Sequence, residues 1–355
     1  MKKSTLIAAL IVATLTACSN YMEDDDNSQQ QTAPDSQITF TPMEIQTIGV
    51  VTKNTTRAAQ TTKSTITEYG VSSSIYPAAN SYTSAGCGSY WFNQNVDATS
   101  GNSGHYWPGA DYRASFFAYA PYGLAGLAPR SKNDLGHPVY EYTVPSAIAN
   151  QADFITAEVL DHSGAAETEP VPLTFSHQCT DIRFNVYNQG SDAITVHSIA
   201  ISGVKYSGTC TNGVWTLTPV VNSTSVNPFL LSLGTVVAAD ATVDVTGTNN
   251  HFIMLPQTVT SGTAIFDVDA TVSGVRKHYY HTLTSNLELL KSKSYTFNLT
   301  LGEGALIVDT ETDIQDWEME VKYLNIGGVS TNKTWSQPGI NDGQDIGAED
   351  WTEEE

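Results

Sequence analysis

Basic residues are scarce in this chain. The 16 Lys and Arg residues stand against 37 Asp and Glu residues, so the formal net charge is −21. Nucleic acid is therefore not expected as a partner, because phosphate contacts need clustered Lys and Arg. Cysteine is scarce as well: beyond Cys18, only Cys87, Cys179 and Cys210 occur. Three cysteines with no zinc-type spacing allow at most one disulfide and indicate small buried side chains rather than redox chemistry.

Catalytic signatures are also missing. The sequence contains no Gly-x-Ser-x-Gly, no His-Glu-x-x-His and no glycine loop of the phosphate-binding type. We therefore expect no enzyme activity, no catalytic residues, no cofactor and no metal site. The eight histidines are scattered among strand-like segments. For His177, at the end of one such segment, a hydrogen bond in the core or at a sheet edge is the favoured interpretation.

The first residues have the pattern of an export signal. Lys2 and Lys3 precede the short apolar run 6–13, and Leu15-Thr16-Ala17-Cys18 follows. A charged head, an apolar stretch shorter than a membrane span and small residues at its end predict a signal peptide over 1–17. The last four residues resemble the bacterial lipoprotein signal, in which the cysteine is lipidated. Cys18 is thus expected to anchor the exported chain in a membrane, since several acyl chains bind firmly.

The remainder of the sequence is typical of an all-β protein. Short runs rich in Thr, Tyr, Val and Ile alternate with turn residues, and no long amphipathic helical pattern occurs. Such regular spacing favours antiparallel β-sandwiches. The predicted division is a leader over 18–57, an N-terminal sandwich over 58–161, a C-terminal sandwich over 167–322 and an acidic tail over 323–355. After the signal no apolar run is long enough to span a membrane.

The segment 38–58 organises these predictions. It begins with alternating apolar and hydroxyl residues and continues with β-branched ones, a pattern that favours a half-buried strand. Pro42 and Gly49 indicate a bulge or a break within it. Arg57-Ala58 follows in a polar segment of the kind that proteases cleave, although an ordinary linker is an alternative interpretation. The residues expected in the strand are Ile38, Phe40, Ile45, Ile48 and Val50.

Several short motifs follow one another along the chain in a fixed order: Ile38-Thr39-Phe40 before Thr56-Arg57-Ala58, the Tyr106-Trp107-Pro108 turn before Phe116-Phe117-Ala118-Tyr119-Ala120-Pro121, Asp153-Phe154-Ile155-Thr156-Ala157, Leu173-Thr174-Phe175-Ser176-His177, Leu255-Pro256-Gln257, Lys293-Ser294-Tyr295-Thr296-Phe297 and Asp316-Trp317. Taken together, these motifs resemble a known family, the fimbrillins, which are the Mfa-like and FimA-like subunits of type V pili. Each motif is weak alone, and their order carries the resemblance. The acidic C-terminal extension departs from the family pattern.

The resemblance implies a fold and a life cycle. It implies two transthyretin-like sandwiches in tandem, and a lipid-anchored precursor on the outer face of the cell outer membrane. An arginine-specific protease would cut between Arg57 and Ala58 and remove the leader strand. The mature chain would then join other fimbrillin subunits in a pilus by strand exchange. A candidate donor strand lies at 319–329 and contains Met319, Val321, Tyr323 and Ile326.

A second function class is compatible with the same residues. The chain is then a surface lipoprotein that binds a glycan or a host ligand without polymerising. Aromatic residues that could stack on sugars, or equally serve in a sandwich core, are Tyr82, Tyr90, Trp91, Tyr106 and Trp107. The two classes differ at the leader strand, which a polymerising subunit loses and a monomeric binder keeps.

Overall fold

The computed structural model describes most of the chain. It covers residues 37–43, 66–82, 88–130, 137–167, 169–226, 228–247 and 250–302, with the backbone of 306–308 and 313–316. Strands dominate this part, together with one short 3-10 turn, η1 (Ile148–Asn150). The all-β prediction is confirmed. Among these residues there is no helix of the length and apolarity that a membrane span requires.

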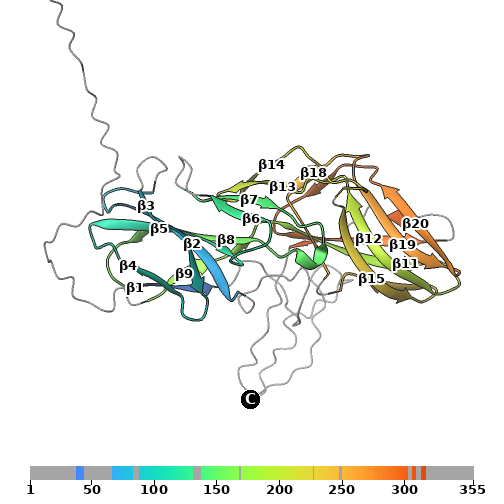
Figure 1. The fold of residues 1–355 in the computed structure, drawn as a ribbon, viewed down its shortest axis with the longest axis horizontal. Helices are drawn as coiled ribbons and strands as arrows, with labels where there is room; N and C mark the ends of the chain where they lie inside the picture. The colour runs from blue at the N-terminus through green and yellow to red at the C-terminus, as the bar shows by residue number, and fades with distance from the viewer. Residues whose placement is uncertain are drawn as a thin grey trace, which may run out of the picture. The chain divides into compact units, whose positions relative to one another are not determined.

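Two sheets form the N-terminal half (Figure 1). The larger has the strand order β10-β8-β5-β2-β3 and consists of β2 (Glu68–Pro77), β3 (Gly88–Asp97), β5 (Tyr112–Ala120), β8 (Ile155–Ser163) and β10 (Ser176–His177). The smaller has the order β4-β1-β9 and consists of β1 (Gln37–Met43), β4 (Asn102–Tyr106) and β9 (Val171–Thr174). Buried side chains of both sheets belong to one hydrophobic cluster, called here the N-terminal cluster. This arrangement is a β-sandwich.

Two larger sheets form the C-terminal half. One contains β11 (Thr180–Asn188), β16 (Ala241–Asp244), β17 (Phe252–Met254), β22 (Lys293–Leu301), β23 (Leu306–Val308) and β24 (Asp313–Asp316). The other has the order β15-β12-β19-β20, with β12 (Ile194–Ser202), β15 (Phe229–Val237), β19 (Ile265–Val272) and β20 (Val275–Thr282). A two-stranded ribbon joins β18 (Gln257–Val259) to β21 (Leu287–Leu289). Their buried side chains form the C-terminal cluster.

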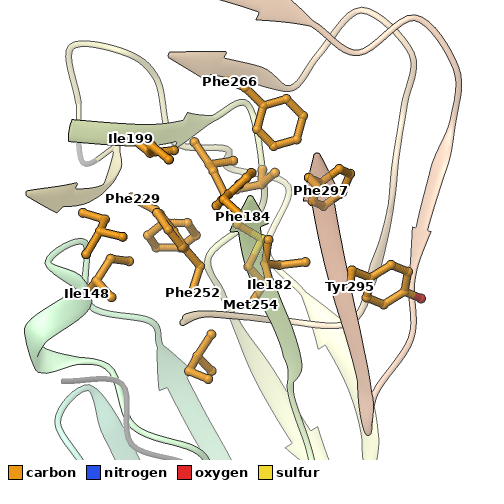
Figure 2. Packing of buried hydrophobic residues seen from close by; sticks show 14 of the residues in the cluster. Ile148, Ile182, Phe184, Ile199, Phe229, Phe252, Met254, Phe266, Tyr295 and Phe297 are labelled. Atoms are coloured by element: carbon orange, nitrogen blue, oxygen red, sulfur yellow. The ribbon is translucent and has the colours of Figure 1, made fainter. Parts of the chain in front are cut away.

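The alternation of buried and partly exposed side chains along β11 explains why one face of this strand packs in the C-terminal cluster. In β11, Ile182, Phe184 and Val186 are buried, and the residues between them are partly exposed. Figure 2 shows Phe184 among the aromatic rings of the cluster, with its centroid 5.3 Å from Phe252 and 5.8 Å from Phe297. Burying one such side chain contributes about 1.5–3 kcal/mol, so this period-two pattern decides which face of the strand turns inward.

Most pairs of strands are antiparallel, as predicted, but two pairs are parallel. β11 runs parallel to β22 over eight residue pairs, from Asp181↔Ser294 to Asn188↔Leu301. β1 runs parallel to β9 over four pairs, from Phe40↔Val171 to Met43↔Thr174. Parallel neighbours need long connections, and both pairs join segments more than a hundred residues apart. Local sequence patterns therefore contain no signal for them.

A further sheet, which packs on the C-terminal cluster, combines strands from both halves of the sequence. The sheet β14-β13-β7-β6 pairs β6 (Leu127–Arg130) and β7 (Val139–Thr143) with β13 (Ser207–Thr211) and β14 (Val214–Leu217). Tyr140, Tyr142 and Phe154 belong to the C-terminal cluster, although they precede the predicted boundary at 162–166. Val171, Leu173 and Phe175 belong to the N-terminal cluster, although they follow it. The two clusters thus exchange segments across that boundary, and the division into separate domains stays a prediction.

Two cysteines lie in the C-terminal cluster. Cys179 and Cys210 are buried free thiols, whereas Cys87 lies outside the described residues. Burial raises the pKa of Cys210 to about 11 and that of Cys179 well above its ordinary value. Neither is a ready nucleophile at neutral pH, because the thiolate is the reactive form. Their role is that of small apolar side chains in the core.

Candidate functional site: the slot of strand β1

The short strand β1 is inserted into the middle of a sheet. Its sequence, Gln37-Ile-Thr-Phe-Thr-Pro-Met43, alternates, and Ile38 and Phe40 are 0% and 3% exposed. Pro42 is also buried, while Thr39 is half-buried. Apolar side chains at every second position enter the N-terminal cluster together. We call the space that β1 fills, between β4 and β9, the β1 slot.

Pro42 lies within β1 and does not break it, contrary to the sequence-based expectation. The N–H of Phe40 donates to the carbonyl of Gly101 at 2.8 Å, so the backbone groups of every second residue point toward β4. Pairing with β4 ends at Thr39↔Asn102, whereas pairing with β9 continues through Pro42↔Leu173. The missing N–H of Pro42 thus falls on the side where no ladder continues, a position that proline tolerates.

Polar contacts fix β1 on its β4 side. The buried hydroxyl of Ser103 donates to the carbonyl of Ile38 at 2.7 Å. The amide of Asn102 donates to Gln37 Oε1 at 2.8 Å. The preceding turn is held by Asp97, whose carboxylate accepts the backbone N–H groups of Ser100 and Thr99. The backbone hydrogen bond from Ser100, and then that from Thr99, lower the pKa of Asp97.

Aromatic side chains line the floor of the slot. The rings of Phe40 and Phe116 meet edge to face at 5.1 Å, and Phe116 also contacts Trp91 and Trp107. The imidazole of His105 stacks on Trp91 at 4.2 Å, and burial lowers the pKa of His105, which favours its neutral form. Edge-to-face pairs of this kind add about 0.5–1.5 kcal/mol beyond area burial. The slot is therefore built for an aromatic residue at position 40.

Both neighbours of β1 depend on it for pairing. Within the described chain, β4 and β9 have β1 as their only ladder partner in this sheet. Loss of β1 would leave two unpaired edges facing each other across an apolar floor. An unpaired edge is a template for another strand, and two facing edges fix the incoming strand on both sides. The geometry is thus that of a strand-binding site occupied by the chain's own residues.

The close contact between Gly101 and the backbone of β1 can be tested by substitution. Its φ is +64°, and a Cβ at this position would lie 2.0 Å from the carbonyl oxygen of Phe40. Gly104 has a similar φ of +74°, but a Cβ there meets no atom within 4 Å. Both Gly→Ala changes should cost about 1–2 kcal/mol of backbone strain. Only Gly101→Ala should cost about 1–3 kcal/mol more, because β1 must move.

Chemical denaturation measures the free energy of unfolding of the two alanine variants. Each variant is made both in the full chain and in a chain that begins at Ala58. The two alanine variants should differ in the full chain and agree in the shorter one, where β1 is absent. Equal losses in the full chain, or the same difference without β1, would contradict the proposed contact.

The structure places only some of the predicted site residues. Ile38 and Phe40 lie in the slot, and Trp91 and Trp107 are buried beside them rather than exposed to a ligand. Tyr106 is 52% exposed. The predicted residues outside the described ranges are Cys18, Ile45, Ile48, Val50, Arg57, Ala58, Met319, Val321, Tyr323 and Ile326.

His177 is buried against a carboxylate. Its Nδ1 lies 2.6 Å from Asp153 Oδ2, and both side chains are 0% exposed. Sequence reasoning favoured a hydrogen-bonding role for this histidine, and the contact agrees with it. Among the residues that the structure describes, no group of three or more His, Cys, Asp or Glu is placed to hold a metal ion.

Sequence reasoning missed the other half of the slot. Gly101 and Ser103 touch the β1 backbone, and Val171 and Leu173 pair with it from β9. The run Asp97-Ala-Thr-Ser-Gly101 has the composition of a turn, a signal that could have predicted a tight chain reversal there. Nothing in the sequence linked that turn, or β9, to residue 40, because the contacts are remote along the chain.

Comparison with known proteins agrees with this architecture. The profile of a fimbrillin-like family matches residues 33–317. A fimbrial protein from Bacteroides vulgatus has a similar solved structure, with a TM-score of 0.54, 16% identity, and coverage of 79% of this chain and 99% of that chain. A candidate cell adhesion protein from Bacteroides ovatus follows, with a TM-score of 0.51, 16% identity, and coverage of 80% and 99%. None of the curated proteins compared matches the chain. At such identities the two structures show a shared fold.

Proposed function

Because the chain belongs to the fimbrillin-like family, we propose that it is a structural or accessory subunit of a type V pilus, assembled by strand exchange for adhesion. The family match supports a pilus or adhesin subunit at the cell surface. Assembly by strand exchange is supported by the β1 slot, in which strand β1 completes a sheet between two edges. The family assignment also favours a non-enzymatic protein.

The proposed life cycle begins at the membrane. Cys18 carries the lipid that holds the precursor at the outer membrane, and β1 seals the slot until the leader is cut after Arg57. Each of Ile38 and Phe40 contributes about 1.5–3 kcal/mol through burial. Strand β1 therefore stays bound in the slot while it is covalently attached to the sandwich. After cleavage, β1 is no longer covalently linked to the sandwich, and a strand of another subunit can replace it. Main-chain hydrogen bonds to β4 and β9 would hold the incoming strand.

Cleavage is tested at Arg57. An Arg57→Ala variant should remain full-length and lipid-bound, and it should not enter pili, because β1 stays tethered in the slot. N-terminal mass spectrometry of surface-sheared material and of the membrane fraction measures this. Gln60→Ala serves as the matched control, because it changes an uncharged residue of the same polar segment and should be cut normally. Assembly of the Arg57→Ala chain at the wild-type level would contradict the proposal.

The strand that refills the slot is proposed to come from a C-terminal tail. The sequence of residues 319–329 alternates as that of β1 does, and an extended strand here would place Met319, Val321 and Tyr323 on one face. A truncation that ends at Glu318 removes this segment and should therefore abolish SDS-resistant multimers, while a truncation that removes only 351–355 should leave them intact. Gel analysis of cells expressing each chain measures the outcome. Unchanged multimers from the shorter chain would mean that this subunit accepts a strand and donates none.

A further inference from the structure

A long stretch of the C-terminal half carries no charge. Residues 206–239 contain no Asp, Glu, Lys, Arg or His, and this is the longest such run in a chain whose formal net charge is −21. The run includes β13, β14 and β15. Half of the large hydrophobic residues that are exposed in the described part of the chain also lie in it, namely Val214, Val220, Val221, Val226, Leu230 and Val236.

Four of these exposed residues lie at one end of the sheet β15-β12-β19-β20. Asn222 is buried and donates to the carbonyl of Ile201 at 3.1 Å, and a tight turn from Ser223 to Val226 follows it. Phe229, the first residue of β15, pairs with the same Ile201. The loop before β15 and the start of β15 are therefore both fixed beside the end of β12. We call the surface formed by the four residues the β15 surface: Val220, Val221, Val226 and Leu230.

A hollow of about 470 Å³ adjoins the β15 surface. It lies between the first part of β15 and η1, which is next to that strand (Figure 1). Ile148, Leu230 and Leu231 give it an apolar lining, and no charged side chain is among the described residues that line it. Such a hollow receives an aliphatic side chain and offers no partner to a charged one.

The outer edge of β15 is open along most of its length. Within the described chain β15 forms a ladder with β12 alone, and on its other side a single bridge joins Leu230 to Ala147. Edge strands usually carry a charged residue or a proline that prevents pairing with another chain, and β15 has neither. Its register with β12 is interrupted once, opposite His197. An uncharged edge beside exposed apolar side chains is typical of a protein-binding surface.

The charge of the chain decides which partner fits. Two copies with a net charge of −21 each repel one another wherever their acidic surfaces meet. Across the β15 surface two copies approach without placing like charges opposite each other, whereas a strongly charged partner finds no countercharge there. A second copy also presents the same apolar side chains and the same hollow, so each can fill the hollow of the other across a two-fold axis. We propose that two copies of this chain bind each other through their β15 surfaces.

This contact is separate from the β1 slot. It involves neither Ile38 nor Phe40, and it forms in a chain that still carries β1. In a pilus, strand exchange joins subunits along one fibre, and the β15 surfaces would join subunits of neighbouring fibres side by side. Only this last consequence rests on the proposed function.

Two substitutions place a charge on the β15 surface, and each has a control of the same residue type and similar exposure. Leu230→Glu changes a residue that is 42% exposed, and its control Leu160→Glu changes one that is 40% exposed in β8. Val226→Glu changes a residue that is 59% exposed, and its control Val275→Glu changes one that is 55% exposed in β20. Because a two-fold contact contains each residue twice, each surface variant adds two negative charges to it.

Sedimentation velocity over a concentration series measures the dimer. The sample is the chain from Ser19 onward with Arg57→Ala, which carries no lipid and keeps β1 attached, so strand exchange does not contribute. The chain should form a reversible dimer that added salt strengthens, because salt screens the repulsion between the acidic copies. Leu230→Glu and Val226→Glu should each raise the dissociation constant about tenfold or more, since like charges in an interface are costly. Both control variants should leave it unchanged.

Hydrogen exchange locates the contact without any surface variant. The amides of β15 and of residues 220–226 should exchange more slowly at high concentration than at low concentration, and those of β20 should not change. A chain that stays monomeric at every concentration, a dimer that both surface variants leave intact, or a dimer that salt dissociates would overturn the proposal. Pilus assembly is tested separately by cleavage at Arg57 and by the tail truncations, so the two proposals fail independently.

Discussion

Phe40→Ala is expected to lower the free energy of unfolding of the full chain by about 3–5 kcal/mol, as large-to-small changes of buried aromatic residues do. The side chain is 3% exposed and contacts Phe116 edge to face, so alanine leaves a cavity on the floor of the β1 slot. Chemical denaturation measures the loss. It is a large share of the roughly 5–15 kcal/mol that a domain has in total.

The neighbouring residue gives the control for this prediction. Thr39 lies in the same strand, is half-buried, and points to the opposite face. Thr39→Ala should change the free energy of unfolding by about 0.5 kcal/mol or less, as surface substitutions usually do. If both variants lose the same amount, strand β1 stabilises the sandwich through its backbone alone, and the proposed seal by Phe40 is wrong.

Asp153→Ala is expected to cost about 1–3 kcal/mol, since the fully buried side chain of His177 loses a hydrogen-bond partner. The pair with His177 is 2.6 Å long and fully buried. It also joins two places where the chain passes between clusters, because Asp153 precedes Phe154 and His177 follows Phe175. Thermal and chemical denaturation of the full chain measure the loss.

An exposed pair of the same chemistry serves as the control. His278 Nδ1 lies 3.2 Å from Asp267 Oδ1, but these side chains are 52% and 21% exposed. Asp267→Ala should cost about 1 kcal/mol or less, because exposed pairs are screened by water. Asp153→Asn keeps an acceptor oxygen and the side-chain volume, so it should lose less than Asp153→Ala. Similar losses at positions 153 and 267 would show that burial of the His177 pair has no special weight.

Prediction from sequence succeeded where the signal was local. The alternation in Ile38-Thr-Phe40 predicted a strand with these two side chains inward, and the structure buries both. Burial of period-two residues follows from strand geometry alone, so a few residues suffice for the inference. The all-β class followed from the same kind of pattern repeated along the chain.

The features that the sequence did not predict depend on contacts between residues that are far apart in the chain. Pro42 suggested a break because its sequence neighbours do not reveal that it pairs with Leu173 on one side only. The predicted boundary at 162–166 is rich in small and polar residues, but segments before it contribute to the C-terminal cluster and segments after it contribute to the N-terminal cluster.

The exchange of segments between the two clusters also decides how the subunit bears tension. Tyr119 reaches the C-terminal cluster from within strand β5, whose neighbouring residues lie in the N-terminal cluster. Apart from this side chain, the described chain passes from one cluster to the other three times, between Ala120 and Leu124, between Phe154 and Ile155, and between Phe175 and Cys179. A single connecting segment would let two lobes swing and would carry a pulling force alone. Three covalent passages divide that force among them. Stretching the molecule therefore requires that a cluster itself be torn open, which makes it a stiff link under load.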